Sequence, residues 1–209
     1  MPRSLNNIFE NQGSDKNRNG YTCVYDSLWK NIRDRPLKIL EIGVGCTLLM
    51  GDNYQPGASL RSWAEYFPNA SIVGTDIAPE VVNLEFMNGR VSTHECNSTI
   101  PQQVNSFIEK MRTKFDIPHG PLFDIIIDDG SHLEQHQIDT LSNLFPLLVD
   151  GGYYVLEDIG GDTRNLGYKS CSHFLPPRNT IKNIIGEHTH SFVVHDWIQH
   201  DSAMLVISK

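Results

Sequence analysis

Short aliphatic runs alternate with amphipathic segments from residue 37 onward. Four apolar runs predict strands at 37–43, 71–76, 123–129 and 151–158, and a weaker pattern predicts one more at 90–96. The spacing of apolar residues predicts helices near 59–67, 79–87, 100–115, 133–147 and 177–186. Continuous aliphatic strands that are separated by helices indicate a parallel sheet covered on both faces.

The end of the chain predicts one more pair of strands, at 191–198 and 202–209, with a turn at 199–201. So short a link cannot hold the helical crossover that parallel neighbours need, so these strands must be antiparallel. The expected fold class is therefore α/β, with a seven-stranded, mostly parallel sheet, a C-terminal antiparallel hairpin and helices on both faces. With 209 residues, 39% of them hydrophobic, the chain fits one domain spanning 1–209.

Charge and cysteine content narrow the partners and the compartment. The 17 basic and 25 acidic residues give a net charge of −8, so neither nucleic acid nor an anionic membrane is an expected partner. No apolar run approaches the ~20 residues that span a bilayer. The four cysteines show no short-range pairing, so we expect reduced thiols and a cytoplasmic location.

The first predicted strand ends in Glu41, which is followed by Gly43 and Gly45. Ligands of such sheets bind at the carboxyl ends of the strands, where glycines let the backbone approach a ligand closely. The dinucleotide fingerprint needs a glycine at the position of Leu48, so an NAD or nucleotide-sugar enzyme is disfavoured. The two glycines fit either a cofactor loop or an ordinary strand-ending turn.

Asp76 ends the second predicted strand. A carboxylate at this place can accept hydrogen bonds from both hydroxyl groups of a ribose, which is a common way to hold adenosine in these sheets. The alternative is a helix cap, because Pro79 follows three residues later. Taken with the glycine pair, Asp76 predicts a cofactor that contains adenosine.

Four carboxylates are expected to crowd the ends of the fourth and fifth strands: Asp128, Asp129, Glu157 and Asp158. The predicted helix 133–147 joins the two strands as a crossover, so they should be parallel neighbours. Carboxylates that lie so close repel one another, and a bound cation is the natural neutraliser. Oxygen ligands favour Mg²⁺, with Mn²⁺ or Ca²⁺ as substitutes, over Zn²⁺. For a single aspartate, a helix cap or a bond to a loop amide is the alternative.

His132 follows Asp129 by three residues, at the start of the next predicted helix. Imidazole is the natural general base near neutral pH, so His132 is the expected proton acceptor beside the carboxylates. A structural histidine is the alternative. His136 lies one helical turn later and further from the carboxylates, and it is not an expected base.

Five segments together resemble one family: GSDK (13–16), LEIGVG (40–45), GASLRSW (57–63), IDDGSH (127–132) and GGYYVLED (151–158). From residue 13 to about residue 160, the chain resembles the metal-dependent sugar O-methyltransferases of macrolide biosynthesis, of the macrocin and mycinamicin type. These enzymes are sometimes grouped with amino-sugar N-methyltransferases. The resemblance implies a class I methyltransferase fold, S-adenosylmethionine as methyl donor, and Mg²⁺.

The resemblance also implies roles for single residues. It places the metal ligands on Asp129, Glu157 and Asp158, and the base on His132. The cofactor-binding residues that the resemblance and the motifs indicate are Asp15, Lys16, Glu41, Gly43, Gly45, Ser59, Arg61, Asp76 and Asp128. Residues 1–36 are expected to form an N-terminal cap segment. Residues 160–180, which match no pattern of the family, are expected to form a substrate loop.

The expected activity is Mg²⁺-dependent methyl transfer from S-adenosylmethionine to a hydroxyl group of a sugar or glycosylated small molecule. Asp129 is the rival base to His132, although a metal-bound carboxylate is the weaker base. One alternative is an amine acceptor, which gives N-methylation of an amino sugar. Another is a non-catalytic module that binds S-adenosylmethionine, although such a module has no evident use for the four crowded carboxylates and His132. The sequence is compatible with a homo-oligomer.

Overall fold

The computed structural model describes residues 3–18, 20–159, 178–186, 190–195 and 203–209. The chain divides into two compact units, an N-terminal unit (1–95) and a C-terminal unit (96–209), and each contains its own set of paired strands. That the whole chain is one domain stays a prediction.

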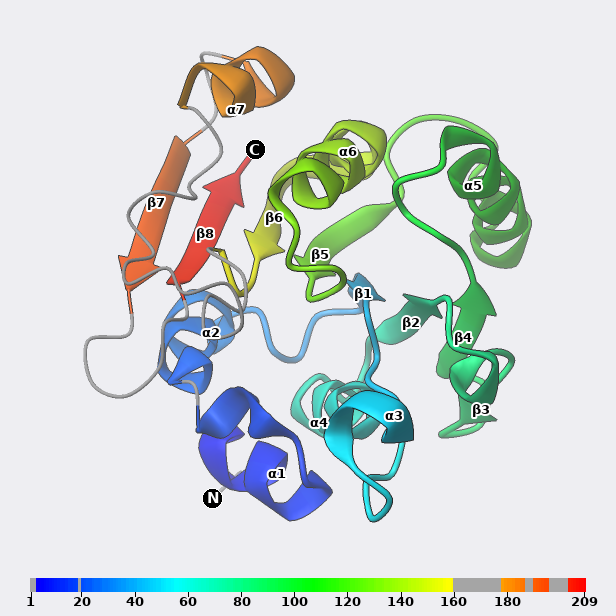
Figure 1. Cartoon of the computed structure of the whole chain (residues 1–209), viewed down its shortest axis with the longest axis vertical. Coiled ribbons are helices and arrows are strands. Elements are labelled where there is room, and N and C mark those ends of the chain that lie inside the picture. Colours follow the sequence, from blue (N-terminus) through cyan, green and yellow to red (C-terminus); the bar gives the residue numbers. More distant parts are fainter. Residues whose placement is uncertain (1–2, 19, 160–177, 187–189, 196–202) are drawn as a thin grey trace. The chain divides into compact units, whose positions relative to one another are not determined.

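The N-terminal unit is built on three parallel strands, β1 (Lys38–Ile42), β2 (Ser71–Asp76) and β4 (Val91–Glu95). They confirm the first three predicted strands. A two-residue strand, β3 (Glu85–Phe86), pairs antiparallel with β4, so the order is β3-β4-β2-β1 (Figure 1). In the β1–β2 register, Ile42 lies opposite Thr75, so β1 and β2 end together.

Three helices of this unit pack around an aromatic core: α1 (Leu5–Gln12), α2 (Tyr21–Trp29) and α4 (Ala58–Tyr66). The unit also contains α3 (Thr47–Met50), which has no buried residue, and short 3₁₀ turns at Asp15–Asn17 (η1) and Pro79–Val81 (η2). Trp63 of α4 is fully buried, and its ring centre lies 4.7 Å from that of Phe9 in α1 and 5.1 Å from that of Tyr25 in α2. Edge-on aromatic packing of this kind fixes the N-terminal cap segment to α4.

The predicted helix at 79–87 is wrong. Only the 3₁₀ turn η2 forms there, and the chain then continues into β3. Asn83, Met87 and Asn88 adopt left-handed backbone conformations, with φ values of 60°, 54° and 57°. Residues in that conformation cannot continue a right-handed helix, so the segment becomes a turn-bounded edge strand.

The C-terminal unit pairs β5 (Phe123–Asp128) parallel with β6 (Leu148–Leu156), with α6 (Glu134–Leu144) and a 3₁₀ turn, η3 (Phe145–Leu147), between them in the sequence. This confirms the predicted parallel crossover. Strand β8 (Ala203–Ser208) pairs antiparallel with both β6 and β7 (His190–His195), which confirms the terminal hairpin and gives the order β5-β6-β8-β7.

Two further helices complete this unit, α5 (Pro101–Phe115) and α7 (Arg178–Ile185). Both match predicted helices. Of the expected substrate loop 160–180, residues 160–177 lie outside the described residues, as does the predicted turn at 199–201. Among the helices that the structure describes, none has the length and apolar character of a membrane span.

Candidate functional site

The glycine loop, residues 43–45, follows β1 in the N-terminal unit. Gly43 and Gly45 have φ values of 78° and 74°, which side chains other than glycine rarely adopt. A Cβ atom added to Gly45 would lie 2.5 Å from the hydroxyl oxygen of Tyr54, so a side chain there would strain the backbone and displace the Tyr54 ring. The loop is thus a tight strand-ending turn, and a role of the two glycines in cofactor binding stays a prediction.

Asp76 holds the glycine loop to the end of β2. Its Oδ2 atom accepts a hydrogen bond from the Val44 amide at 2.9 Å. Its Oδ1 atom accepts hydrogen bonds from the amides of Ile77 and Ala78, at 2.7 and 2.9 Å. The carboxylate therefore holds the turn between β2 and η2. The alternative, a helix cap, is wrong, because the N-cap residue of η2 is Ala78 and no side chain caps that turn. An ionised carboxylate has about four acceptor positions, so a ribose hydroxyl can still bind, and that role stays a prediction.

Three predicted cofactor residues contact one another inside the N-terminal unit. Lys16 and Glu41 are 2% and 0% exposed, and the Lys16 Nζ atom lies 3.4 Å from Glu41 Oε1. The Ser59 hydroxyl group donates a hydrogen bond to Glu41 Oε2 at 2.8 Å. Asp15, the neighbour of Lys16, is exposed. The structure thus brings Lys16, Glu41 and Ser59 together as a buried cluster.

Arg61 contacts the loop that precedes α4. Its guanidinium group donates to the carbonyl groups of Gln55 and Pro56, each at 2.8 Å, and lies 6.0 Å from the ring centre of Phe86. Burial lowers the pKa of this group. Beside it is a cavity of about 420 Å³, lined by Gln55, Pro56, Arg61, Glu80, Leu84, Glu85, Phe86 and Met87. Contact between Arg61 and a cofactor stays a prediction.

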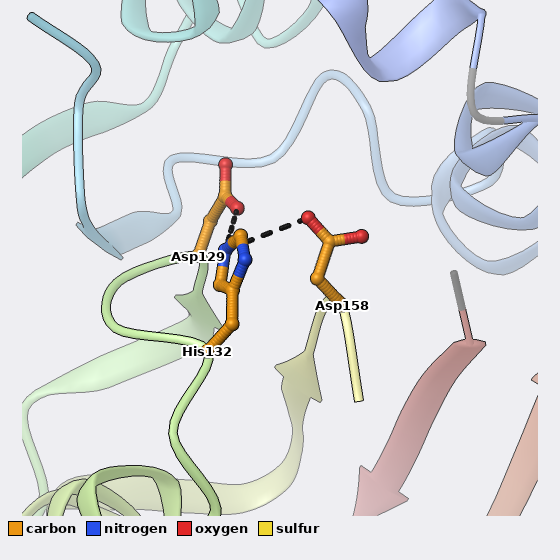
Figure 2. Close-up of side chains that lie close together, drawn as sticks. All are labelled: Asp129, His132 and Asp158. Atoms are coloured by element: carbon orange, nitrogen blue, oxygen red, sulfur yellow. Dashed lines mark ion pairs between the residues drawn. The ribbon is translucent and has the colours of Figure 1, made fainter. Parts of the chain in front are cut away.

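In the C-terminal unit, Asp129, His132 and Asp158 meet. Asp129 follows β5, Asp158 follows β6 with a left-handed φ of 48°, and His132 lies in the segment before α6. The His132 Nε2 atom lies 3.6 Å from Asp129 Oδ1 and 3.5 Å from Asp158 Oδ2, as Figure 2 shows. One ligand atom of each residue lies within 4.8 Å of those of the other two. We call these residues the acidic cluster.

The electrostatics of His132 follow from this placement. Burial alone would lower the pKa of the imidazole. The nearby carboxylate of Asp129 and the negative charges of Asp158 and Asp128 outweigh burial and raise the pKa above its ordinary value. The imidazole therefore binds a proton more readily than an ordinary histidine does, because the two carboxylates stabilise its positive charge.

Asp128 and Glu157 lie behind the acidic cluster. Asp128 is buried and accepts hydrogen bonds from the Tyr154 hydroxyl group and the Gly130 amide, each at 3.3 Å. Glu157 is 1% exposed; its amide donates to the Asp128 carbonyl oxygen at 2.9 Å, and its own carbonyl oxygen accepts a bond from Gln137. Among the described residues, the group that could share one ion does not contain Glu157. Its role as a metal ligand, and that of Asp128 as a cofactor residue, stay predictions.

Two residues that we did not predict as site residues contact the glycine loop and the segment that carries His132. The Tyr54 hydroxyl group donates to the Val44 carbonyl oxygen at 3.3 Å, and burial with the charges of Glu41 and Asp15 raises its pKa to about 12. Nothing in the sequence marks Tyr54. His136 Nδ1 lies 2.8 Å from Ser131 Oγ and so contacts the segment that carries His132. The sequence signal for this contact is the Ser-His pair of the IDDGSH segment. That pair lies about one helical turn before His136.

The donor set of the acidic cluster fits a hard divalent cation. Mg²⁺ is typically held by one or two carboxylates and keeps several waters, which matches the oxygen atoms of Asp129 and Asp158. An imidazole within 4 Å of both carboxylates fits a group that accepts a proton from a bound molecule.

Comparison with known proteins found sugar O-methyltransferases. The chain is 38% identical over 138 residues to L-olivosyl-oleandolide 3-O-methyltransferase of Streptomyces antibioticus, covering 66% of this chain and 32% of that protein. It is 36% identical over 148 residues to 8-demethyl-8-alpha-L-rhamnosyl tetracenomycin-C 2'-O-methyltransferase of Streptomyces olivaceus, covering 70% and 35%. It is 33% identical over 141 residues to mycinamicin VI 2''-O-methyltransferase of Micromonospora griseorubida, covering 66% and 31%. The chain thus spans about a third of the length of these curated relatives.

Solved structures match nearly the whole chain. The methyltransferase MycE of the mycinamycin biosynthetic pathway, in complex with Mg, SAH and mycinamycin VI, matches with a TM-score of 0.69 at 24% identity, covering 100% of this chain and 56% of that one. A second crystal form, with Mg and SAH, matches with a TM-score of 0.66 at 25% identity, covering 98% and 53%. No protein-family model matches the chain. The expected methyltransferase fold class is confirmed.

Proposed function

The chain is related in sequence to the sugar O-methyltransferases of the macrocin and mycinamicin type, and from this premise we propose that it methylates a sugar hydroxyl group. The methyl donor is S-adenosylmethionine, the metal is Mg²⁺, and the acceptor is a sugar or a glycosylated natural product. The observation that carries the proposal is the acidic cluster, in which one imidazole lies beside two carboxylates. The relatives are named for methylation of sugar hydroxyl groups, which supports the same acceptor class here.

Donor binding is assigned to the N-terminal unit. Asp76 keeps acceptor capacity for a ribose hydroxyl group, and the glycine loop that it holds offers backbone at the carboxyl end of β1. The absence of a glycine at Leu48 supports a donor without a pyrophosphate. These residues bind and orient the donor, because a displacement on an activated methyl group depends mainly on how the donor is held.

Acceptor activation is assigned to the C-terminal unit. Asp129 and Asp158 would hold Mg²⁺, which when bound lowers the pKa of a coordinated hydroxyl group and orients it. His132 takes the proton of the reacting hydroxyl group at its Nε2 atom. The oxygen then forms a bond to the methyl carbon as the carbon–sulfur bond breaks, and the electron pair of that bond leaves with S-adenosylhomocysteine (SAH).

Two alternatives remain. An amine acceptor would give N-methylation and would depend much less on His132, because a neutral amine is already a good nucleophile and need not lose a proton first. A non-catalytic module would bind S-adenosylmethionine without turnover. The placement of His132 between two carboxylates favours the hydroxyl acceptor, since it provides a base that an amine does not need.

The deciding experiment measures methyl transfer to matched acceptors. The chain is incubated with methyl-labelled S-adenosylmethionine, Mg²⁺ and pairs of glycosides that differ only by a hydroxyl or an amino group on the sugar. We expect one labelled methyl group on the hydroxyl member of a pair, and no transfer in EDTA. Transfer only to amino sugars supports the first alternative, and donor binding without transfer to any acceptor supports the second.

The remaining assignments follow from this activity. The partner is a small-molecule acceptor, and the enzyme works in the cytoplasm. A homo-oligomer stays a prediction, to be measured by sedimentation of the purified chain.

A further inference from the structure

Lys16 and Glu41 form an ion pair inside the N-terminal unit, 3.4 Å apart and almost without exposure to solvent. A buried charge is costly unless a partner compensates it, so each of the two side chains depends on the other. The Ser59 hydroxyl group engages the second carboxylate oxygen of Glu41 at 2.8 Å. Both oxygens of Glu41 therefore have protein groups beside them.

These contacts join three elements at one place. Lys16 lies in η1, Glu41 is the last but one residue of β1, and Ser59 lies in the first turn of α4. Glu41 comes two residues before Gly43, so its position fixes where the glycine loop begins. The GSDK segment is thereby fastened to the strand end that carries the loop.

Tyr54 contacts the glycine loop and lies within the electrostatic influence of the pair. The charges of Glu41, Asp15 and Lys16 all act on its hydroxyl group, and that group donates to the Val44 carbonyl oxygen in the middle of the loop. The Tyr54 ring also fills the space beside Gly45. A shift of the Lys16–Glu41 pair would therefore reach the loop along β1, because Glu41 lies at the end of that strand.

We propose that Lys16 and Glu41 are a positioning pair, which sets the glycine loop for the methyl donor without contacting the donor. The inference rests on the proposed function, because it takes S-adenosylmethionine as the molecule at the loop. It differs from the expectation that both residues are donor ligands. With 2% and 0% exposure, neither side chain offers a surface to a ligand, whereas the neighbouring Asp15 is exposed.

A double-mutant cycle on the 209-residue chain separates positioning from direct contact. Lys16→Met and Glu41→Gln each remove one charge of the pair and leave the other charge buried, and the double variant removes both charges. The readout is SAH affinity by calorimetry, well below the unfolding temperature of each variant. We expect each single variant to lose roughly 10–100-fold in affinity, the range typical of groups one layer behind a ligand. The double variant should return to within about threefold of the parent.

Controls keep the outcome independent of stability. Arg3→Met and Glu65→Gln disrupt an exposed ion pair of the same unit, 3.1 Å long, and should leave SAH affinity unchanged. Ser59→Ala keeps both charges and removes one hydrogen bond, so it should fold and lose affinity less than the single charge variants do. If a single charge variant does not fold, Ser59→Ala replaces it in the test. A Ser59→Ala variant with the SAH affinity of the parent then overturns the proposal.

The possible outcomes separate the two proposals. Folded single variants with parental affinity overturn the positioning role. A double variant as weak as the weaker single variant, or weaker still, overturns it in favour of direct donor contact. A parent chain that does not bind SAH overturns the proposed function, and this inference falls with it.

Discussion

The Tyr154 hydroxyl group donates a hydrogen bond to Asp128 Oδ2 at 3.3 Å, between the parallel strands β6 and β5. Both side chains are buried. Burial, aided by the charge of Asp129, raises the pKa of Asp128 to about 7, although the bonds from Gly130 and Tyr154 act in the opposite direction. Asp128 therefore changes charge near neutral pH, directly behind the acidic cluster.

The first prediction concerns stability and pH in EDTA. The pKa of Asp128 is higher in the folded chain than its ordinary 3.8, so folding favours the protonated form. The stabilisation is complete below pH 3.8 and is lost as the pH rises through about 7. Since one pKa unit is ~1.4 kcal/mol, the whole effect is of the order of 4 kcal/mol. Asp128→Asn should remove this part of the pH dependence of the unfolding free energy, as measured in urea.

A second variant controls this measurement. Tyr154→Phe removes the hydroxyl donor, so it should keep or steepen the pH dependence that Asp128→Asn removes. If the parent and Asp128→Asn lose stability in parallel between pH 4 and pH 8, Asp128 is already ionised in the folded chain and the prediction is wrong.

The fold was readable where aliphatic runs were continuous, as in β2 and β5, whose bounds match the sequence to within a residue. The N-terminal helices α1 and α2 were missed, since α1 has few apolar residues and α2 begins after Gly20 without a side chain that caps it. Yet α1 has readable signals: Ser4 caps its start, Gly13 ends it in a left-handed conformation, and Leu5, Ile8 and Phe9 share its buried face. At 79–87 the opposite error occurred: a helix was predicted that does not form. A proline there signals a helix start, but the residues after it adopt left-handed backbone conformations.

The second prediction concerns Asp76. Asp76→Ala should weaken S-adenosylmethionine binding tenfold or more, since each charge-assisted hydrogen bond contributes about 1.5–3 kcal/mol. It should also lower the unfolding free energy, because the amides of Val44, Ile77 and Ala78 lose their acceptor. Calorimetry and urea unfolding measure the two effects.

A neighbouring carboxylate gives the matched control for Asp76. Glu80 holds the start of α3 by accepting a bond from the Thr47 amide at 2.6 Å, and no ribose role is assigned to it. Glu80→Gln should therefore leave the donor affinity near that of the parent. A folded Asp76→Ala variant with parental affinity would place the adenosine site elsewhere.

The third prediction tests the metal through His132. A cation bound by Asp129 and Asp158 neutralises charges that raise the imidazole pKa, so Mg²⁺ and the proton compete. We expect the pKa of His132, followed by NMR, to lie above its ordinary value in EDTA and to fall on addition of Mg²⁺. Metal affinity should correspondingly fall as the pH drops through this pKa.

Asp158→Asn should lower the pKa of His132 in EDTA and abolish the Mg²⁺-dependent shift. Asp139→Asn, which changes a carboxylate of α6 outside the acidic cluster, should do neither. A pKa of His132 that does not respond to Mg²⁺ in the parent would mean that the two carboxylates hold no cation, and they would then be assigned to hydrogen bonds with the acceptor.

Strand order was the only part of the sequence analysis from which contacts in the candidate site could be predicted. Asp129 and Asp158 follow parallel neighbouring strands, so their meeting, and that of His132 with them, could be predicted from the crossover. The contact of Lys16 with Glu41 could not, because it depends on how η1 packs against β1, which no local pattern encodes. Glu157 illustrates the limit at a single position. Both Glu157 and Asp158 follow the last residue of β6, and only Asp158, whose left-handed φ of 48° no sequence pattern indicates, lies in the acidic cluster.

The last prediction separates a hydroxyl acceptor from an amine acceptor. If the imidazole accepts the proton of the reacting hydroxyl group, His132→Ala should lower kcat by ~10²–10⁴-fold and leave donor and metal affinity nearly unchanged. Activity of the parent should fall as the pH drops through the imidazole pKa, because the protonated ring cannot accept a proton, and this limb should vanish in the variant. His136→Ala is the matched control, since that ring contacts Ser131 and lies outside the acidic cluster. On an amine acceptor the limb should follow the pKa of the amine, and both variants should stay active. A His132→Ala variant that keeps more than about half of its activity on a confirmed hydroxyl acceptor would leave Asp129 as the base.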